Sequence, residues 1–316
     1  MAFFYQVYGL KLKSDLELPE LVPIADQAVD FSISLGPVPE ALSDSRAFGS
    51  WADYLDTSCL FRIDNIGRYL IEDGRSITVE PCGPSETDHG AAAALSDVRL
   101  YLLGSALAAL LHQRGLLPLH VSAVLADSGV WAFTGPSGAG KSTVAGWLSQ
   151  DAGLPLISDD VSVVSAQNNS IRLFPGPRKL KLWDDAVDFL KLEKRRLVQD
   201  LSNTPKFQLY LPDDTPGHQF GMTGLIMLER AEPGERAELI PVTGIDRFRC
   251  CCQAVYRHYM ARWFRTKADY VRDVFQLSEA IQVYRLRRPW SLEQLGHEGN
   301  PLVDLLLTDK EEAVSR

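Results

Sequence analysis

The chain has 316 residues, of which 46% are hydrophobic and 23% are charged. This balance is typical of a globular protein that is large enough for two modest domains or one large one. The formal net charge of −9 argues against a general binder of nucleic acids or of anionic membranes.

The first residues, Met-Ala-Phe-Phe-Tyr-Gln, lack the basic start and the long apolar stretch of a signal peptide. The five cysteines form no C-x-x-C pair, and three of them are consecutive at 250–252 in a predicted helix, which favours free thiols over zinc ligands or disulfides. We therefore expect a cytoplasmic protein that binds neither nucleic acid nor membrane.

Residues 1–94 are predicted to form a small, mostly β N-terminal domain. Residues 4–8 and 31–35 are short strand candidates, and residues 68–71 and 76–80 flank an Asp-Gly turn that marks a hairpin. This module is a candidate surface for recognising a peptide.

Residues 95–316 are predicted to form a catalytic domain of the α/β class with a mixed sheet. Ser96 is expected to cap a helix that ends near Gly115. Its most apolar part, residues 100–111, is too short to span a bilayer and predicts a buried helix. A strand at 119–125 then forms a hairpin with a strand at 130–134.

Residues 135–142 read Gly-Pro-Ser-Gly-Ala-Gly-Lys-Ser, a complete G-x-x-x-x-G-K-[ST] phosphate-binding loop. Its glycines let backbone N–H groups point inward as an anion-binding nest, and the helix predicted at 143–148 adds the positive end of its dipole. In this pattern Lys141 reaches the β- and γ-phosphates, and the hydroxyl of Ser142 is a ligand for Mg²⁺. The residues expected to contact the nucleotide are Gly135, Ser137, Gly138, Ala139, Gly140, Lys141, Ser142 and Thr143.

Two adjacent carboxylates follow the next predicted strand, at 155–158. Asp159 and Asp160 lie 18 and 19 positions after Lys141, where a Mg²⁺ ligand or a general base is expected. The alternative is a solvated turn or a helix cap, which aspartate also favours.

His120 and a basic segment are further candidates. His120 is expected on the strand that pairs with the one leading into the loop, where it would orient a base or a phosphate or serve as a structural, hydrogen-bonded histidine. Arg178, Lys179 and Lys181 would neutralise charge on a transferring phosphoryl group, or else lie in solvent. Weaker candidates of the same kind are Lys206, Arg249 and Arg257.

The later part of the chain is predicted with less regularity. Residues 166–220 show no clear periodicity, and residues 224–229 and 237–241 are expected to pair as a hairpin. Three helices, at 246–259, 267–280 and 291–295, and one strand at 282–286 complete the prediction.

Three segments together resemble the catalytic domain of the HPr kinase/phosphorylase family. They are Leu-His-Val-Ser-Ala-Val at 119–124, the loop at 135–142, and Ser-Asp-Asp at 158–160, with the histidine fifteen residues before the first loop glycine. The resemblance implies a kinase of the phosphoenolpyruvate-carboxykinase-like fold that uses ATP and Mg²⁺ to phosphorylate a serine hydroxyl. It also implies that Asp159 is the general base, with Asp160 nearby and His120 in the active site.

The chain also departs from that family. It has no Arg-Gly-Leu-Gly segment after the aspartate pair, and Thr143 stands where the family has glutamate. HPr as the acceptor and the reverse phosphorylase reaction are therefore not expected. The chain more closely resembles the HPr-kinase-related proteins of peptide-modification clusters, including lasso-peptide kinases, at residues 8–10, 14–21, 174–183 and 283–289.

This resemblance implies a kinase for a ribosomally made precursor peptide, modified at a C-terminal serine, or for a small protein. Two alternatives stay open: a kinase for a small metabolite, and a nucleotide-binding regulatory module without transfer activity. A base beside the Mg²⁺ carboxylate distinguishes the kinases from the regulatory module. The sequence leaves open whether the chain forms a homo-oligomer.

Overall fold

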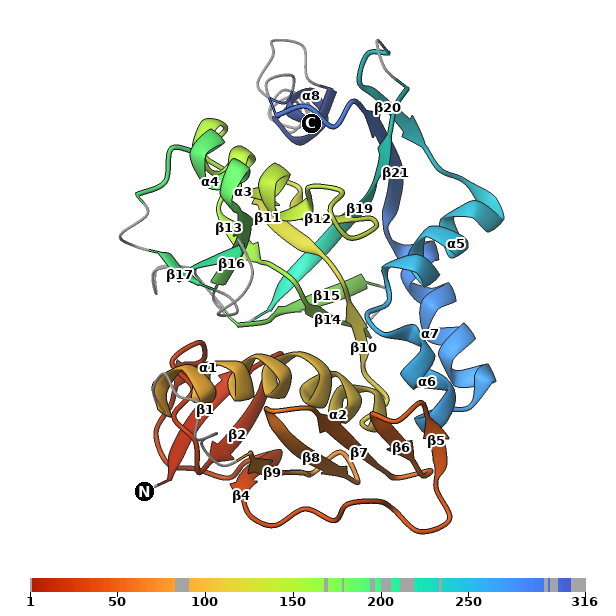
Figure 1. Cartoon of the computed structure of the whole chain (residues 1–316). Helices are drawn as coiled ribbons and strands as arrows, with labels where there is room; N and C mark the ends of the chain where they lie inside the picture. The colour runs from red at the N-terminus through yellow and green to blue at the C-terminus, as the bar shows by residue number, and fades with distance from the viewer. Residues whose placement is uncertain are drawn as a thin grey trace. The chain divides into compact units, whose positions relative to one another are not determined.

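The computed structural model describes residues 2–82, 91–167, 170–177, 179–193, 197–199, 206–210, 219–232, 235–292, 295 and 301–307 (Figure 1). The described chain divides into two compact units. One contains residues up to 118 together with 256–270, and the other contains residues 119–199, 206–255 and 271–307. The predicted domain boundary between residues 94 and 95 remains a prediction.

The first unit is built on a nine-stranded sheet with the order β3-β1-β2-β4-β9-β8-β7-β6-β5. The strands are β1 (Phe3–Val7), β2 (Leu10–Ser14), β3 (Val22–Pro23), β4 (Phe31–Leu35), β5 (Arg46–Phe48), β6 (Ala52–Tyr54), β7 (Ser58–Ile63), β8 (Gly67–Glu72) and β9 (Ser76–Pro81). The predicted hairpin forms, because β8 and β9 pair antiparallel around the Asp73-Gly74 turn.

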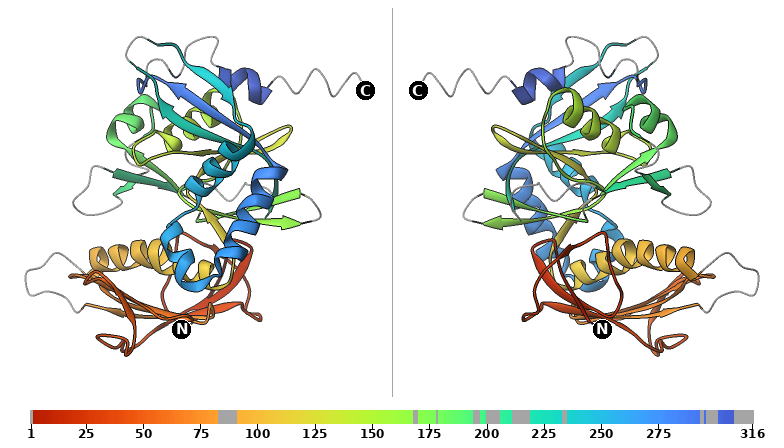
Figure 2. Two further views of the ribbon diagram at one scale, coloured as in Figure 1. Left: turned by 90° about the vertical axis from the view of Figure 1, so that its right-hand side faces the viewer. Right: turned by 90° about the vertical axis from the view of Figure 1, so that its left-hand side faces the viewer.

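One long helical segment lies against a face of this sheet (Figures 1 and 2). It consists of α1 (Ala91–Tyr101), one π-helical turn η1 (Leu102–Ala106) and α2 (Leu107–Gln113). The predicted cap at Ser96 is wrong, since the helix already begins at Ala91; four alanines with high helix propensity extend it backwards. Residues 95–113 are long and apolar enough to cross a membrane by composition alone, yet 61% of their apolar window is buried within the protein, as in a core helix. The predicted burial is confirmed.

The second unit contains a large mixed sheet in the order β14-β15-β19-β12-β11-β13, with β21 paired to β19 and to β20. The strands are β11 (Ser122–Ala126), β12 (Gly129–Thr134), β13 (Leu156–Ser158), β14 (Ser162–Gln167), β15 (Ser170–Pro175), β19 (Phe220–Arg230), β20 (Glu238–Pro241) and β21 (Gln282–Arg288). A short strand, β10 (Leu117–Leu119), precedes them in the chain. The predicted mixed α/β class is confirmed.

The direction of the strands places the functional loops. β12 runs parallel to β19, and β19 runs parallel to β21. β11 is antiparallel to both β12 and β13, so β13 also runs in the direction of β12. The carboxyl ends of β12, β13, β19 and β21 therefore lie at one edge of the sheet, where ligands of open α/β sheets bind.

The predicted hairpin of residues 224–229 and 237–241 is wrong. Instead β21, which comes forty residues later in the chain, lies between β19 and β20 and pairs with both. The pairing partner was distant in sequence, and the local turn signal did not reveal it.

Residues 166–220 are also more regular than predicted. They contain β15, a three-stranded sheet and a short helix, α4 (Asp184–Phe189). The small sheet has the order β16-β18-β17, formed by β16 (Lys179–Trp183), β17 (Leu197–Gln199) and β18 (Lys206–Tyr210).

The remaining helices are α3 (Lys141–Asp151), α5 (Gly244–Ala254), α6 (His258–Phe264), α7 (Lys267–Ala280) and α8 (Pro301–Leu307). The prediction of α7 is confirmed, whereas the helix predicted at 246–259 breaks after Ala254, because Val255 is extended and Arg257 has a φ of 48°. Of the helix predicted at 291–295, the described residues 291, 292 and 295 are not helical.

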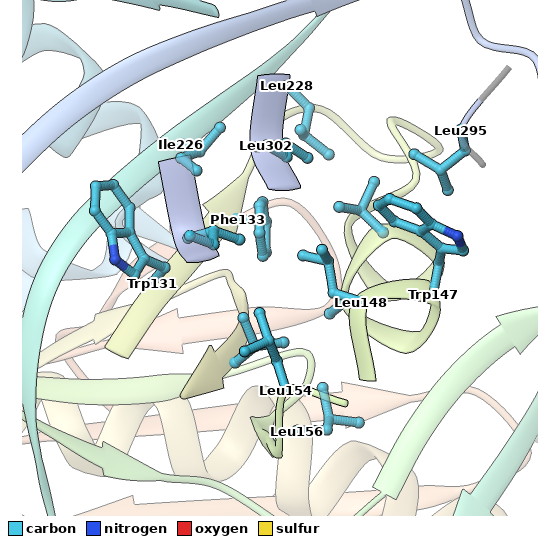
Figure 3. Close-up of a cluster of buried hydrophobic side chains, with 14 of the residues drawn as sticks. Trp131, Phe133, Trp147, Leu148, Leu154, Leu156, Ile226, Leu228, Leu295 and Leu302 are labelled. Atoms are coloured by element: carbon cyan, nitrogen blue, oxygen red, sulfur yellow. The ribbon is translucent and has the colours of Figure 1, made fainter. Parts of the chain in front are cut away.

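The core of the second unit lies around α3 and the central strands (Figure 3). Val144 and Leu148 of α3 are fully buried and Trp147 is 5% exposed, as their predicted spacing on one face requires. Phe133 of β12 and Leu228 of β19 belong to the same cluster. This packing fixes the helix that begins at the phosphate-binding loop.

Candidate functional site

The predicted strand, loop and helix are present as β12, residues 135–140 and α3. Gly140 precedes α3 with a φ of +86°, a left-handed conformation that favours glycine. The first turn of α3 has backbone N–H groups without helical partners and carries the positive end of the helix dipole. The loop thus has the backbone form that an anion-binding nest needs.

Lys141 lies across the inside of this loop. Its side chain is largely buried, and Nζ donates hydrogen bonds to the carbonyl oxygens of Gly135 at 3.1 Å and Pro136 at 3.3 Å. A cation held at this place faces the position of a bound phosphate in the pattern that the sequence predicts.

Asp159 follows β13 and lies against the start of α3. Its carboxylate accepts a hydrogen bond from the hydroxyl of Ser122 at Oδ1, and one from the backbone N–H of Lys181 at Oδ2, 2.8 Å away. The side chain of Ser142 also acts on this carboxyl group and lowers its pKa. Asp159 is 1% exposed, so it is neither a solvated turn residue nor a surface cap.

Asp160 has its own partners and shares Lys181 with Asp159. Its Oδ2 accepts a hydrogen bond from Nζ of Lys181 at 2.7 Å, and its Oδ1 lies 3.7 Å from Nε2 of His120. Asp160 has a φ of +76°, which costs energy for a residue other than glycine, and such strained positions often occur at functional sites. The unusual backbone turns two neighbouring carboxylates toward different partners.

The two carboxyl groups have opposite pKa shifts. Burial raises the pKa of Asp159; the hydrogen bonds from Ser122, Lys181 and Ser142 lower it in part, and the charge of Asp160 raises it. Burial also acts to raise the pKa of Asp160, but the charge and hydrogen bond of Lys181 outweigh burial and hold it below its ordinary value, with help from the charges of His120 and Lys179. A pair whose pKa values are pushed apart suits the roles of proton acceptor and permanent anion.

The prediction that His120 lies within a strand is wrong, because the residue lies between β10 and β11. Its backbone N–H donates to the carbonyl of Ala254 at 2.7 Å, and its own carbonyl accepts from Oγ1 of Thr134 at 3.2 Å. These backbone bonds hold the ring next to Asp160. The hairpin of β11 and β12 forms as predicted, but it begins at Ser122.

A pocket of about 220 Å³ opens beside the loop. It is lined by Ser137, Gly138, Ala139, Gly140, Lys141, Ser142, Thr143, Lys181, Trp183, Asp185, Ala186, Arg288, Trp290 and Leu292. Seven of the eight residues expected to contact the nucleotide therefore share one cavity, and Gly135 alone does not line it.

The sequence predictions did not include Arg288 in the site. It is the last residue of β21, is 6% exposed, and lines the pocket. Its Nε is buried without a hydrogen-bond partner among the described residues, and a Cβ built on Gly140 would stand 2.9 Å from its Nη2. Burial lowers the pKa of this guanidinium. An anion in the pocket would satisfy this charge.

The other cations lie in different places. Arg178 lies outside the described residues. Lys179 is buried in β16, and its charge acts on Asp160. Lys206 begins β18, and Arg249 is exposed on α5 and pairs with Asp246. Arg257 belongs to the other compact unit and donates to the hydroxyl of Tyr259.

The oxygen donors of the site fit Mg²⁺. This ion is usually held by one or two carboxylates together with substrate phosphates and waters, rather than by a full set of protein ligands. Among the described residues no cluster of three or more His, Cys, Asp or Glu is suited to a metal. Ser142 and the two aspartates carry oxygens of the kind that would hold such an ion.

No protein-family model and no curated protein sequence matches this chain. Among solved structures, one described as the Hpr(Ser) kinase/phosphatase from Coxiella burnetii aligns with 63% of this chain and 92% of its own, at 14% identity and a TM-score of 0.33. A likeness of that size does not establish a shared fold.

Proposed function

We propose that the chain is an ATP-dependent kinase that transfers the γ-phosphoryl group to a serine hydroxyl. The observation that carries this proposal is the buried carboxylate of Asp159, which Ser122 and the backbone of Lys181 hold by hydrogen bonds and whose pKa Ser142 of the phosphate-binding loop also influences. A regulatory module that only binds nucleotide needs no second carboxylate with a raised pKa beside its Mg²⁺ ligand.

In this proposal the backbone of the loop and Lys141 bind the phosphates, and Arg288 adds a second, buried positive charge. Ser142 and Asp160 would hold Mg²⁺, which neutralises phosphate charge when bound. Asp160 suits this role because its lowered pKa keeps it an anion.

Asp159 orients the acceptor hydroxyl and takes its proton. The serine oxygen forms a bond to the γ-phosphorus, the bond between that phosphorus and the β,γ-bridging oxygen breaks, and ADP leaves with the electron pair. His120 and Lys181 stabilise the negative charge that spreads over the transferring group. A raised pKa makes Asp159 a better proton acceptor than Asp160.

We propose a peptide as the acceptor, specifically a ribosomally made precursor of the lasso-peptide type with a C-terminal serine, in the cytoplasm. The short segments at residues 8–10, 14–21 and 283–289 support this choice. The nine-stranded sheet has edge strands β3 and β5, and an extended peptide binds to such an edge by adding a strand.

The experiment offers ATP and Mg²⁺ together with one of three acceptors: a peptide ending in serine, the same peptide ending in alanine, or a panel of small hydroxyl metabolites. We expect a mass increase of one phosphate on the serine peptide alone. Phosphorylation of a metabolite instead would replace the peptide by the small-metabolite kinase. ATP binding without transfer to any acceptor would favour the regulatory module.

A further inference from the structure

The pocket beside the loop is lined by charged and by aromatic side chains. The phosphate-binding residues line it together with Lys181 and Arg288, and so do Trp183, Trp290 and Leu292. Trp183 and Trp290 are among the exposed large hydrophobic side chains of the described residues, and both line this pocket. Exposed indoles at a concave site indicate a flat, aromatic ligand.

The two tryptophans come from separate elements that end at the pocket. Trp183 is the last residue of β16 and is 46% exposed, and Trp290 follows β21 by two residues and is 39% exposed. The guanidinium of Arg230 lies 5.5 Å from the ring centre of Trp290. A guanidinium over one face of the indole restricts the orientation of the ring and leaves stacking to the opposite face.

We propose that Trp290, with Trp183 as the second wall, forms the subsite for the base of the nucleoside triphosphate. This inference rests on the proposed nucleotide site and identifies how the ligand is held beyond its phosphates. The base stacks on the indole while the triphosphate lies in the nest of residues 137–143. At about 220 Å³ the pocket is smaller than the roughly 300–1,000 Å³ of sites that enclose a whole ligand, so the nucleotide remains partly in solvent.

Stacking alone accepts any base, because every base has a π-face. A base on an aromatic side chain contributes about 5- to 150-fold in affinity, which corresponds to about 1–3 kcal/mol. ATP and GTP should therefore bind within a similar range, and both should bind more tightly than inorganic triphosphate, which has the phosphates without a base.

The test measures the dissociation constants of ATP, GTP and inorganic triphosphate by calorimetry for the intact chain and its variants. In Trp290→Leu the affinity for ATP should fall toward the affinity for inorganic triphosphate, and in Trp183→Leu it should fall less. The affinity for inorganic triphosphate should stay unchanged in both variants. Trp290→Phe should restore most of the difference because it keeps a ring. Phe275→Leu is the matched control, since Phe275 is 54% exposed and lines a different pocket of the same unit.

Equal affinities of ATP and inorganic triphosphate in the wild type would overturn the base subsite, as would an unchanged ratio in both leucine variants. These outcomes leave the phosphate site intact. If instead inorganic triphosphate does not bind to the wild type at all, the proposed phosphate site fails. ATP binding that depends on Trp290 without transfer to serine would support the base subsite and contradict the kinase.

Discussion

Replacing Asp159 with asparagine is expected to abolish phosphoryl transfer without destabilising the protein. Asparagine has nearly the same volume as aspartate. Its amide oxygen still accepts the hydrogen bond from the N–H of Lys181, and its NH₂ group donates to the hydroxyl of Ser122, which at present donates to Asp159. What the variant loses is the negative charge and the ability to take a proton.

Two effects of this substitution can be given a magnitude, one on the rate of transfer and one on the stability of the protein. A general base typically contributes about 10²–10⁴-fold to the rate, so transfer should fall by that amount while ATP binding stays nearly intact. When burial lowers the acid dissociation constant of a carboxyl group about tenfold, and so raises its pKa, the folded state with the charged group loses about 1.4 kcal/mol of stability. For a structure of this size that corresponds to about 3–5 °C in melting temperature. Because the pKa of Asp159 is raised, the neutral asparagine should be equally stable or more stable at neutral pH.

The pH dependence gives the sign of this effect. Below the unfolded pKa of about 3.9 Asp159 is neutral in both states and costs nothing. As the pH rises through its higher folded pKa the cost appears in full, so the melting temperature of Asp159→Asn should exceed that of the wild type at neutral pH and approach it in acid. Transfer by the wild type should fall in the same pH range as Asp159 is protonated.

The assay compares single-turnover transfer to the serine peptide, calorimetric ATP binding and thermal melting from acid to neutral pH. Asp127→Asn, on the exposed turn between β11 and β12, is the control and should change none of the three. Normal transfer by Asp159→Asn would remove Asp159 from the mechanism. If Asp160→Asn loses transfer at every Mg²⁺ concentration while Asp159→Asn recovers at high Mg²⁺, the two aspartates have the opposite roles.

Three further substitutions test the phosphate site. Lys141→Ala should impair both ATP binding and transfer, and unchanged ATP affinity would contradict the assignment of the loop. Gly140→Ala should destabilise the protein by about 1–3 kcal/mol and weaken ATP binding, because Gly140 has a positive φ and Arg288 lies close to it. Gly153→Ala is the control. Gly153 has a φ of +67° and no atom within 4 Å of the added Cβ, so this variant should show only the smaller backbone effect in thermal melting. Arg288→Met should lower the affinity for inorganic triphosphate without lowering the melting temperature. A lower melting temperature with unchanged affinity would show that Arg288 has a structural role only.

The loop, its helix and the aspartate pair could be located from the sequence because each is a short contiguous pattern. The loop is recognised by the spacing of its glycines, Lys141 and Ser142, and α3 by the apolar positions Val144, Trp147 and Leu148. The strand before Asp159 was short but bounded by a proline and two acidic residues, which are typical end signals.

Contacts between distant segments could not be predicted in this way. The parallel pairing of β19 with β21 decides that Arg288 lies beside Gly140, and no local pattern encodes that pairing. A signal was nevertheless available: Arg287 and Arg288 directly follow the strand predicted at 282–286, and basic residues at the carboxyl end of a strand next to a phosphate loop are anion-binding candidates.

The strand β16 was missed although its sequence carries the pattern. Lys179-Leu180-Lys181-Leu182 alternates with the period of a strand, and Leu180 and Leu182 are buried in the core. Its lysines instead favour a solvated loop, because basic side chains usually lie in solvent. Because β16 forms, the N–H of Lys181 bonds Asp159 while its Nζ bonds Asp160, and one residue fixes both carboxylates.

The fate of the γ-phosphate in a single turnover tests the central claim most directly. The intact chain is mixed with ATP labelled in the γ-phosphate, Mg²⁺ and the serine peptide, quenched, and the labelled products are separated. The account predicts that the label appears as phosphoserine in the wild type, and that it stays in ATP in Lys141→Ala and Asp159→Asn. Label found only as inorganic phosphate, or retained in ATP that the wild type demonstrably binds, would contradict it.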